Sequence, residues 1–275
     1  MLVDRACATG PAVPGARGAD AAATGAGAPA YAAGACLAQG PTGRSRNRTV
    51  FIDPGHGGPD PGVTAASAKE STVALAVAAE LAKRLRADGY RVVLSRTGDT
   101  AVRAFAAAAL TDGTLDATQV RLDLQARVRC ANDSHAAALL SIHFNGYTDH
   151  TAGGSQTIYD DVRPFAHESE RLAGALQGAL LQQLKLADRG VLTDDALDAP
   201  TYSDRAESYG HLMLLGPAEP GWLAAGTAMP GALVEPLFLT NPREASLVTA
   251  AGGQRKVAQA LAVGLERYLT DVPTQ

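Results

Sequence analysis

The pattern of apolar and polar residues changes along the chain, and from residue 49 onward it predicts strands and helices in turn. Short runs that are apolar, or that alternate between apolar and polar residues, predict strands. They are TVFID (49–53), YRVVLSR (90–96), AALLSIHFN (137–145), SQTIYDD (155–161), HLMLLG (211–216) and GALVEPLFL (231–239). Longer segments with apolar residues on one helical face predict helices. They cover residues 70–89, 119–134, 167–186 and 257–269.

Strands that alternate with helices indicate an α/β fold, with a mixed, mostly parallel sheet that carries helices on both faces. We expect one domain, which spans residues 49–275. Two stretches rich in Ala, Gly, Asp and Pro, residues 100–118 and 190–230, interrupt the pattern. Long loops in a compact domain often have a function, so we expect residues 190–230 to border a functional groove.

The first part of the chain has neither helical nor strand periodicity. Ala, Gly and Pro occupy 25 of the first 40 positions, which offers little apolar area to bury. We therefore expect residues 1–48 to be a disordered tail. Cys7 and Cys36 could pair with each other in an oxidising compartment or remain free thiols, and Cys130 is expected to be a buried thiol without a role.

The composition excludes some partners. Apolar residues make up 46% of the chain and charged residues 19%, which suits a packed core. A net charge of −4 argues against nucleic acid or an anionic membrane surface as a partner, because both bind basic faces. No apolar run reaches the roughly 18 residues that a membrane-spanning helix needs. We expect a monomer with no membrane span.

Four polar side chains fall where strands end or a helix begins. They are His56, Glu70, His143 and Glu235. Each has an ordinary interpretation by itself: a polar loop residue, a helix-start carboxylate, a half-buried histidine and a paired carboxylate. Together they match a catalytic zinc site, which uses three His or carboxylate ligands, and a fourth carboxylate that acts as base.

The other candidate motifs are weaker. The PGHGG turn at residues 54–58 lacks the Lys-Ser/Thr that ends a phosphate-binding loop. His135, His150 and His167 fit no ligand motif, and we assign them to the surface or to packing. His211 begins a predicted strand and is the remaining candidate for a substrate contact.

Several motifs occur in an order that resembles a known enzyme family. They are FIDPGHGGPDPG (51–62), KESTVAL (69–75), RVRCAN (127–132), SIHFN (141–145), DRGV (188–191) and LVEPLFLTNPRE (233–244). Together they resemble the zinc-dependent N-acetylmuramoyl-L-alanine amidases, which cleave peptidoglycan. The resemblance implies that His56, Glu70 and His143 bind zinc and that Glu235 is the catalytic carboxylate.

Two other functions remain open at this point. One is a different zinc hydrolase, carboxypeptidase-like or an N-acyl-amino-acid deacylase, which would use Arg127 or Arg163 to bind a free carboxylate. The other is a catalytically inactive domain that binds the cell wall.

The location follows from the substrate that the resemblance implies. Peptidoglycan lies outside the cytoplasmic membrane, so we expect an extracytoplasmic enzyme. The first residues show no basic start followed by an apolar stretch, so no export signal can be read there.

Overall fold

The computed structural model describes residues 30–65, 68–197 and 209–271. A seven-stranded sheet forms its centre, with the strand order β1-β5-β2-β6-β9-β7-β8. The strands are β1 Ala35–Gln39, β2 Thr49–Pro54, β5 Arg91–Arg96, β6 Ala138–Ile142, β7 Ser155–Tyr159, β8 Asp188–Thr193 and β9 Gly231–Glu235. A separate two-stranded sheet pairs β3 Thr64–Ala65 with β4 Ala68–Lys69.

The large sheet is mixed and mostly parallel, which confirms the expected class. Strands β5, β2, β6 and β9 run parallel to one another. β1 joins one edge antiparallel to β5. On the other side β7 runs antiparallel to β9, and β8 then pairs parallel with β7. The carboxyl ends of β7 and β8 therefore point to the opposite edge from those of β2, β6 and β9.

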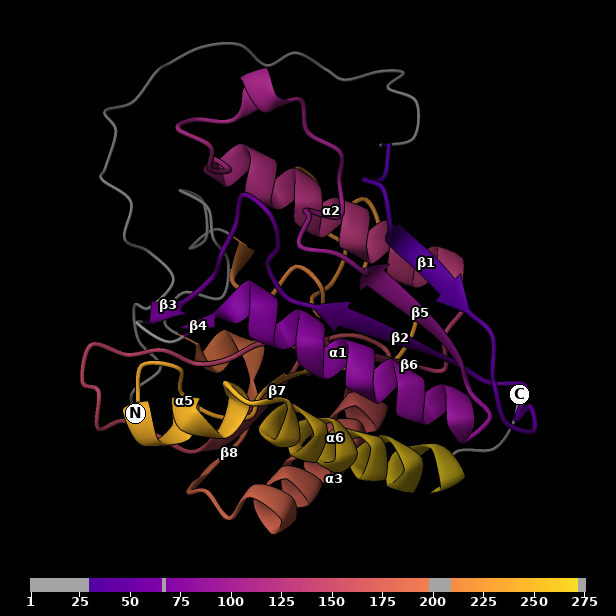
Figure 1. The fold of residues 1–275 in the computed structure, drawn as a ribbon. Helices are drawn as coiled ribbons and strands as arrows, with labels where there is room; N and C mark the ends of the chain where they lie inside the picture. The colour runs from indigo at the N-terminus through magenta and orange to yellow at the C-terminus, as the bar shows by residue number, and fades with distance from the viewer. Residues whose placement is uncertain (1–29, 66–67, 198–208, 272–275) are drawn as a thin grey trace.

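Helices cover both faces of the sheet, as expected (Figure 1). They are α1 Glu70–Ala87, α2 Ala117–Ser134, α3 Ala166–Leu184, α5 Pro242–Val248 and α6 Ala251–Asp271. α1, α3 and α6 pack together on one face, and α2 lies on the other. Within the described part of the chain, no helix is both long and apolar enough to cross a membrane.

Strand β2 shows why the predicted strands are nearly continuous apolar runs. Val50 and Ile52 face the core under α1, α3 and α6. Phe51, between them, faces the core under α2. All three are fully buried, because a sheet covered on both faces buries successive side chains on alternate sides.

The helix ends follow local chemistry. Asp116 and Gln119 form a capping box at the start of α2. At the start of α5 the Asn241 side chain accepts hydrogen bonds from the backbone N–H groups of Arg243 and Glu244, and Pro242 occupies the first turn. Asn241 is therefore the N-cap of α5.

The expectation of a disordered tail through residue 48 is wrong for residues 30–48. β1 pairs along its length with β5, from Ala35 opposite Arg96 to Gln39 opposite Val92. Edge pairing uses backbone hydrogen bonds, so the small side chains of this segment do not prevent it. The folded domain therefore begins before residue 49, where its boundary was predicted. Residues 1–29 lie outside the described part.

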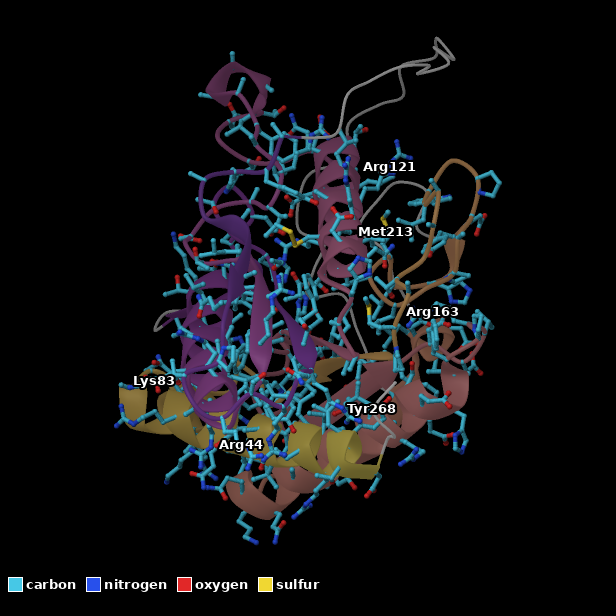
Figure 2. All side chains as sticks on the ribbon, turned by 90° about the vertical axis from the view of Figure 1, so that its right-hand side faces the viewer. Arg44, Lys83, Arg121, Arg163, Met213 and Tyr268 are labelled. Carbon is cyan, nitrogen blue, oxygen red and sulfur yellow. A yellow bond between two sulfur atoms is a disulfide. The ribbon has the colours of Figure 1, made fainter. Side chains whose placement is uncertain are left out.

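The cysteine interpretation is also corrected. Cys36 in β1 forms a disulfide with Cys130 in α2, with Cα atoms 5.6 Å apart and a sequence separation of 94. Figure 2 shows it as a yellow bond. Cys130 is thus a disulfide partner and not a buried thiol without a role. Cys36 pairs with Cys130 and not with Cys7, which lies outside the described residues. Sequence spacing gave no indication of this pairing, because the strand that carries Cys36 was not predicted.

The segment HLMLLG (211–216) is not a strand. The backbone N–H groups of Leu215 and Gly216 both donate to the carbonyl of Leu212, which closes a turn. Its apolar side chains are buried by packing against the α2 side of the sheet rather than by pairing with a strand. Part of the presumed insertion at residues 190–230 instead belongs to the sheet, as the end of β8.

We predict that a chain starting at residue 49 is much less stable than one starting at residue 30. The shorter chain loses β1 and the Cys36–Cys130 disulfide, and a disulfide that closes a loop of this length contributes up to about 4–5 kcal/mol. Thermal unfolding under oxidising conditions measures the difference. Equal melting temperatures for the two chains would contradict the assignment of β1 to the domain.

Candidate active site

Three predicted ligands meet above the carboxyl ends of β2 and β6. His56 lies in the turn after β2, Glu70 begins α1 and His143 follows β6. Glu70 Oε1 is 3.1 Å from His56 Nε2 and 3.0 Å from His143 Nδ1. One donor atom from each residue lies within 4.8 Å of the other two. These three side chains therefore form a group that could hold a metal ion.

Backbone amides fix the Glu70 carboxylate. The N–H of Val63 donates to Oε2 at 2.9 Å, and the N–H of Phe144 donates to Oε1 at 3.0 Å. Burial by itself would raise the pKa of Glu70, but His56 and His143 outweigh it and hold this pKa well below its usual range. Glu70 is thus an ionised carboxylate in a fixed orientation, as a metal ligand must be.

Asp60 orients His56. Its Oδ2 lies 2.8 Å from His56 Nδ1, while its Oδ1 accepts a hydrogen bond from the N–H of Gly62 at 3.1 Å. The other ring nitrogen, Nε2, faces Glu70. Burial opposes the charged imidazole, but Glu70 and Asp60 together raise the pKa of His56 to about 10. A carboxylate on the far nitrogen is the usual support of a metal-binding histidine.

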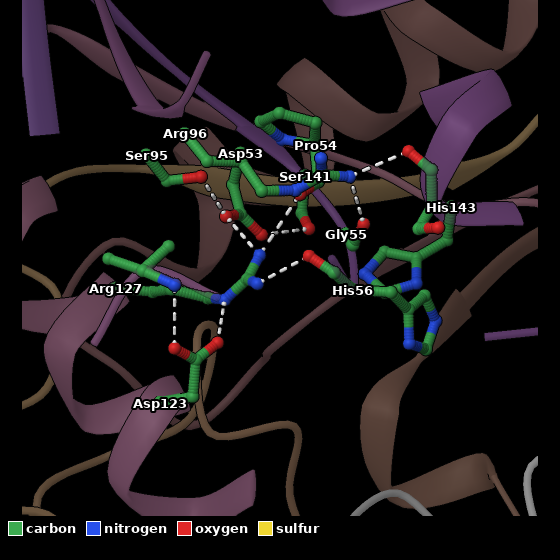
Figure 3. A network of polar contacts seen from close by, with 12 residues as sticks. Asp53, Pro54, Gly55, His56, Ser95, Arg96, Asp123, Arg127, Ser141 and His143 are labelled. Atoms are coloured by element: carbon green, nitrogen blue, oxygen red, sulfur yellow. Dashed lines mark hydrogen bonds and ion pairs between the residues drawn. The ribbon is translucent and has the colours of Figure 1, made fainter. Parts of the chain in front are cut away.

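Asp53, at the end of β2, organises a buried polar network (Figure 3). It accepts hydrogen bonds from Arg127 Nη1 at 2.8 Å, Ser95 Oγ at 2.5 Å and Ser141 Oγ at 2.9 Å. Asp123, one turn before Arg127 on α2, accepts from Arg127 Nε at 2.9 Å. The network joins β2, β5, β6 and α2 directly beneath the candidate site.

Two buried arginines hold the turn that carries His56. Arg127 donates to the carbonyls of Pro54 at 3.0 Å and His56 at 2.6 Å. Arg96 donates to the same Pro54 carbonyl at 3.0 Å and to the carbonyl of Gly55 at 2.8 Å. The backbone carbonyls of three successive residues thus accept hydrogen bonds from guanidinium groups.

Glu235, at the end of β9, lies beside this group. Asn145 Nδ2 donates a short hydrogen bond to Glu235 Oε2. Burial and the negative charge of Glu70 raise the pKa of Glu235 to about 8, although Arg189 and His56 oppose the shift. A carboxyl with a raised pKa is suited to proton transfer near neutral pH.

A cavity runs from the site along the α2 side of the sheet. Its polar end includes Asp53, His56 and His143. Its wall is mostly apolar and is formed by Leu115, Val120, Leu124, Leu212, Met213, Leu214 and Leu233. Residues 212–214 come from the 190–230 stretch, so part of that stretch borders the cavity as expected. Residues 198–208 lie outside the described part.

Sequence reasoning singled out the four central residues but missed their supports. Asp60 could have been found, since it lies four residues after His56 in the same turn. Asp53 is an acidic residue at the end of an apolar strand, which is also a readable signal. Nothing in the sequence shows that Arg96 and Arg127 converge on one turn.

The other residues that the sequence offered for binding a substrate either lie away from the site or already bind other groups of the protein. Arg163 is buried and donates to the carbonyl of Thr227 at 2.7 Å. Arg127 is occupied as described, so neither arginine is placed to bind a free carboxylate. His211 lies between Asp160 and Asp194, at the opposite edge of the sheet from the site. The three remaining histidines, His135, His150 and His167, are exposed, as expected.

The fold and this set of side chains define the catalytic domain of a hydrolase. Residues 50–267 match the family model for N-acetylmuramoyl-L-alanine amidase. The chain therefore belongs to this family and is a peptidoglycan amidase, which confirms the resemblance in its motifs.

Known relatives agree with this assignment. The chain is 29% identical over 225 residues to the germination-specific N-acetylmuramoyl-L-alanine amidase of Bacillus subtilis, covering 82% of this chain and 81% of that one. It is 33% identical over 220 residues to the amidase LytC of the same organism, covering 80% of this chain and 35% of LytC. Among solved structures, the CwlD amidase of Clostridioides difficile, in complex with the GerS lipoprotein, aligns with a TM-score of 0.65 at 25% identity and covers 82% of this chain and 100% of that one.

We predict that Gly62→Ala weakens metal binding at this site. Gly62 has a φ of +63°, and a Cβ there would lie 2.5 Å from Glu70 Oε2 and 2.6 Å from His56 Cδ2. The ligands must move, so we expect zinc affinity to fall by about tenfold or more, which corresponds to about 1.4 kcal/mol. Isothermal titration with zinc measures the change.

Gly113→Ala is the matched control. Gly113 has a similar φ of +79°, but a Cβ there meets no atom within 4 Å. Both substitutions carry the cost of a left-handed alanine, about 1–2 kcal/mol, so only the contact with the ligands differs. Equal zinc affinity in the two variants would show that Gly62 has no part in shaping the site.

Proposed function

We propose that the chain hydrolyses the amide between the lactyl group of N-acetylmuramic acid and L-alanine of the stem peptide, with zinc held by His56, Glu70 and His143. The observation that carries the proposal is the convergence of these three donors beside Glu235. Two imidazoles and one carboxylate are a usual protein ligand set for catalytic zinc, which keeps a fourth position open.

The described residues suit zinc by the way they are held in place as well as by their residue types. Glu70 is anchored by two backbone amides, and Asp60 occupies the far nitrogen of His56. Such supports reduce the reorganisation that metal binding requires. When bound, zinc supplies a Lewis acid that polarises the amide carbonyl and makes an attacking water easier to deprotonate.

Glu235 would act as the general base. It takes a proton from the attacking water and delivers it to the nitrogen of the departing L-alanine. Asn145 holds one carboxylate oxygen in place. The raised pKa of Glu235 makes it a stronger base than an exposed carboxylate, and a nearby cation shifts this pKa back toward its usual range.

Two competing functions are less well supported. A carboxypeptidase-like enzyme or an N-acyl-amino-acid deacylase needs a cationic side chain for a free carboxylate, and both candidate arginines are buried with other partners. An inactive wall-binding domain would not require a carboxylate with a raised pKa next to three converging donors.

The disulfide supports an extracytoplasmic location. Disulfides form and persist in oxidising compartments, and Cys36–Cys130 joins two elements of the catalytic domain. Peptidoglycan lies in the same compartment. We propose that the protein acts there on peptidoglycan as a monomer, without a nucleic-acid partner.

Digestion of purified peptidoglycan tests the reaction. The zinc-loaded protein should release stem peptides with a free amino group on L-alanine and should create no new reducing sugar ends. Reducing ends without free L-alanine amines would indicate a glycosidase, and free amines from other residues would indicate a peptidase. Either result would overturn the proposed reaction.

We predict that Glu235→Gln retains zinc but loses turnover. Glutamine keeps the volume and can hydrogen-bond with Asn145, but it cannot accept the proton. Loss of a general base costs about 10²–10⁴-fold in rate. Zinc content and amine release are measured on the same sample. Full activity would rule out Glu235 as the base, and loss of zinc would identify it as a ligand instead.

We predict that zinc binds more tightly as pH rises. In the metal-free protein the pKa of His56 is raised to about 10, so His56 is protonated at neutral pH and must release that proton to bind zinc. One displaced proton corresponds to about a tenfold gain in affinity per pH unit. Competition with a chelator of known affinity, at pH 6.5, 7.5 and 8.5, measures the slope. An affinity that does not change across this range would contradict the assignment of His56 as a ligand.

A further inference from the structure

A second group of potential ligands lies away from the candidate active site. Asp160 follows β7, Asp194 follows β8, and His211 lies in the connection that leads to β9. β7 pairs antiparallel with β9, with Gln156 opposite Glu235. Asp160 is four residues farther along β7, so it lies about 13 Å from that pairing, at about 3.3 Å per residue.

The three side chains converge on one point. His211 Nδ1 is 3.1 Å from Asp160 Oδ2 and 3.2 Å from Asp194 Oδ1. One donor atom of each residue lies within 4.8 Å of the others. Both carboxylates are fully buried, with 0% of their surface exposed.

One hydrogen on His211 Nδ1 cannot form good hydrogen bonds to both carboxylates at once. His211 Nδ1 carries at most one hydrogen, and its hydrogen-bond geometry favours Asp194 Oδ1. Asp160 Oδ2 is buried and accepts no hydrogen bond within the described part of the chain. A buried carboxylate oxygen without a donor is costly, and it points at the position that the three residues share.

The remaining carboxylate oxygens are anchored by the backbone. Asp160 Oδ1 accepts from the N–H groups of Val162 at 3.2 Å and Arg163 at 2.9 Å. Asp194 Oδ2 accepts from the N–H of Leu212 at 2.8 Å. Each carboxylate thus has one oxygen fixed by amides and the other directed at His211, which holds both in place before any ligand binds.

The same design holds Glu70 in the candidate active site. There too a backbone amide fixes one carboxylate oxygen and a histidine faces the other. A cation at the second group also suits the local charge. Arg163, labelled in Figure 2, places its Nε 3.7 Å from the anchored oxygen of Asp160 and so balances one of the two carboxylates. The second carboxylate, that of Asp194, faces His211.

We propose that Asp160, Asp194 and His211 form a second metal site, which binds a divalent transition metal ion such as zinc in a structural role. One imidazole and two carboxylates suit zinc better than calcium, which prefers oxygen ligands alone. The site is distinct from the three donors near Glu235, and it does not depend on the proposed reaction.

The consequence concerns the wall of the cavity. His211 and the amide of Leu212 begin the turn at residues 211–216, and Leu212, Met213 and Leu214 line the cavity beside His56. An ion at the second site ties this turn to the ends of β7 and β8. The cavity wall is then held from the edge of the sheet opposite to the candidate active site.

Zinc content tests the proposal. The full chain is loaded with zinc chloride, freed of excess metal and analysed for zinc per chain. We expect two zinc ions in the native protein and one in Asp194→Asn, which keeps the size of the side chain but loses its charge. Asp195→Asn is the matched control, because Asp195 is the exposed neighbour, and it should retain two.

A variant of the other site separates the two proposals. His56→Ala should also contain one zinc ion, and the double variant His56→Ala/Asp194→Asn should contain none. Failure of the His56→Ala result would count against the proposed active site alone. One zinc ion in the native protein, unchanged in Asp194→Asn, would overturn the second site.

If Asp194→Asn fails to fold, a crystal of the zinc-loaded native protein tests the second metal site instead. Anomalous scattering at the zinc edge should give a peak between Asp160, Asp194 and His211. Absence of that peak, in a crystal that shows one at the other site, would overturn the proposal.

Discussion

The buried pair of Asp53 and Arg127 is the constraint on which the rest of the site depends. The chain leaves β2 at Pro54 and must present His56 from a turn whose backbone carbonyls still need hydrogen-bond donors. Arg127 from α2 and Arg96 from β5 donate to those carbonyls. Asp53 compensates the charge of Arg127, and loss of one member of such a buried pair leaves the other uncompensated, at a cost of about 3–5 kcal/mol. The position of His56 is therefore set by the packing of three elements.

The surroundings also give the carboxylates of Glu70 and Glu235 different pKa values. Glu70 lies between two imidazoles and two amides, so its pKa stays low and it remains an ionised ligand. Glu235 is half-buried, and its partial burial together with the nearby charge of Glu70 raises its pKa to about 8. Two carboxylates close together thus acquire opposite properties, one for metal binding and one for proton transfer, and their environments cause the difference.

The sequence was sufficient to predict what depends on short-range pattern. The strands β2, β5, β6, β7 and β9, the four long helices and the four central candidate residues could be read from spacing and residue type. β1 could not, because its small residues carry no apolar signal and its pairing with β5 depends on backbone contacts over a long range. The turn at residues 211–216 was read as a strand because a short apolar run has no periodicity that separates the two. The pairing of Cys36 with Cys130 required both β1 and α2 to be in place.

The zinc affinity of Arg127→Lys tests the central claim most directly, that the buried arginine positions His56. Lysine keeps the positive charge but cannot reach Asp53, Asp123 and two carbonyls at once, since it lacks the planar fork of arginine. Arg129→Lys, on an exposed position of the same helix, is the control. In protein that circular dichroism shows to be folded, we expect zinc affinity to fall by about tenfold or more in Arg127→Lys, which corresponds to about 1.4 kcal/mol, and to stay unchanged in Arg129→Lys. Native affinity in folded Arg127→Lys would contradict the claim.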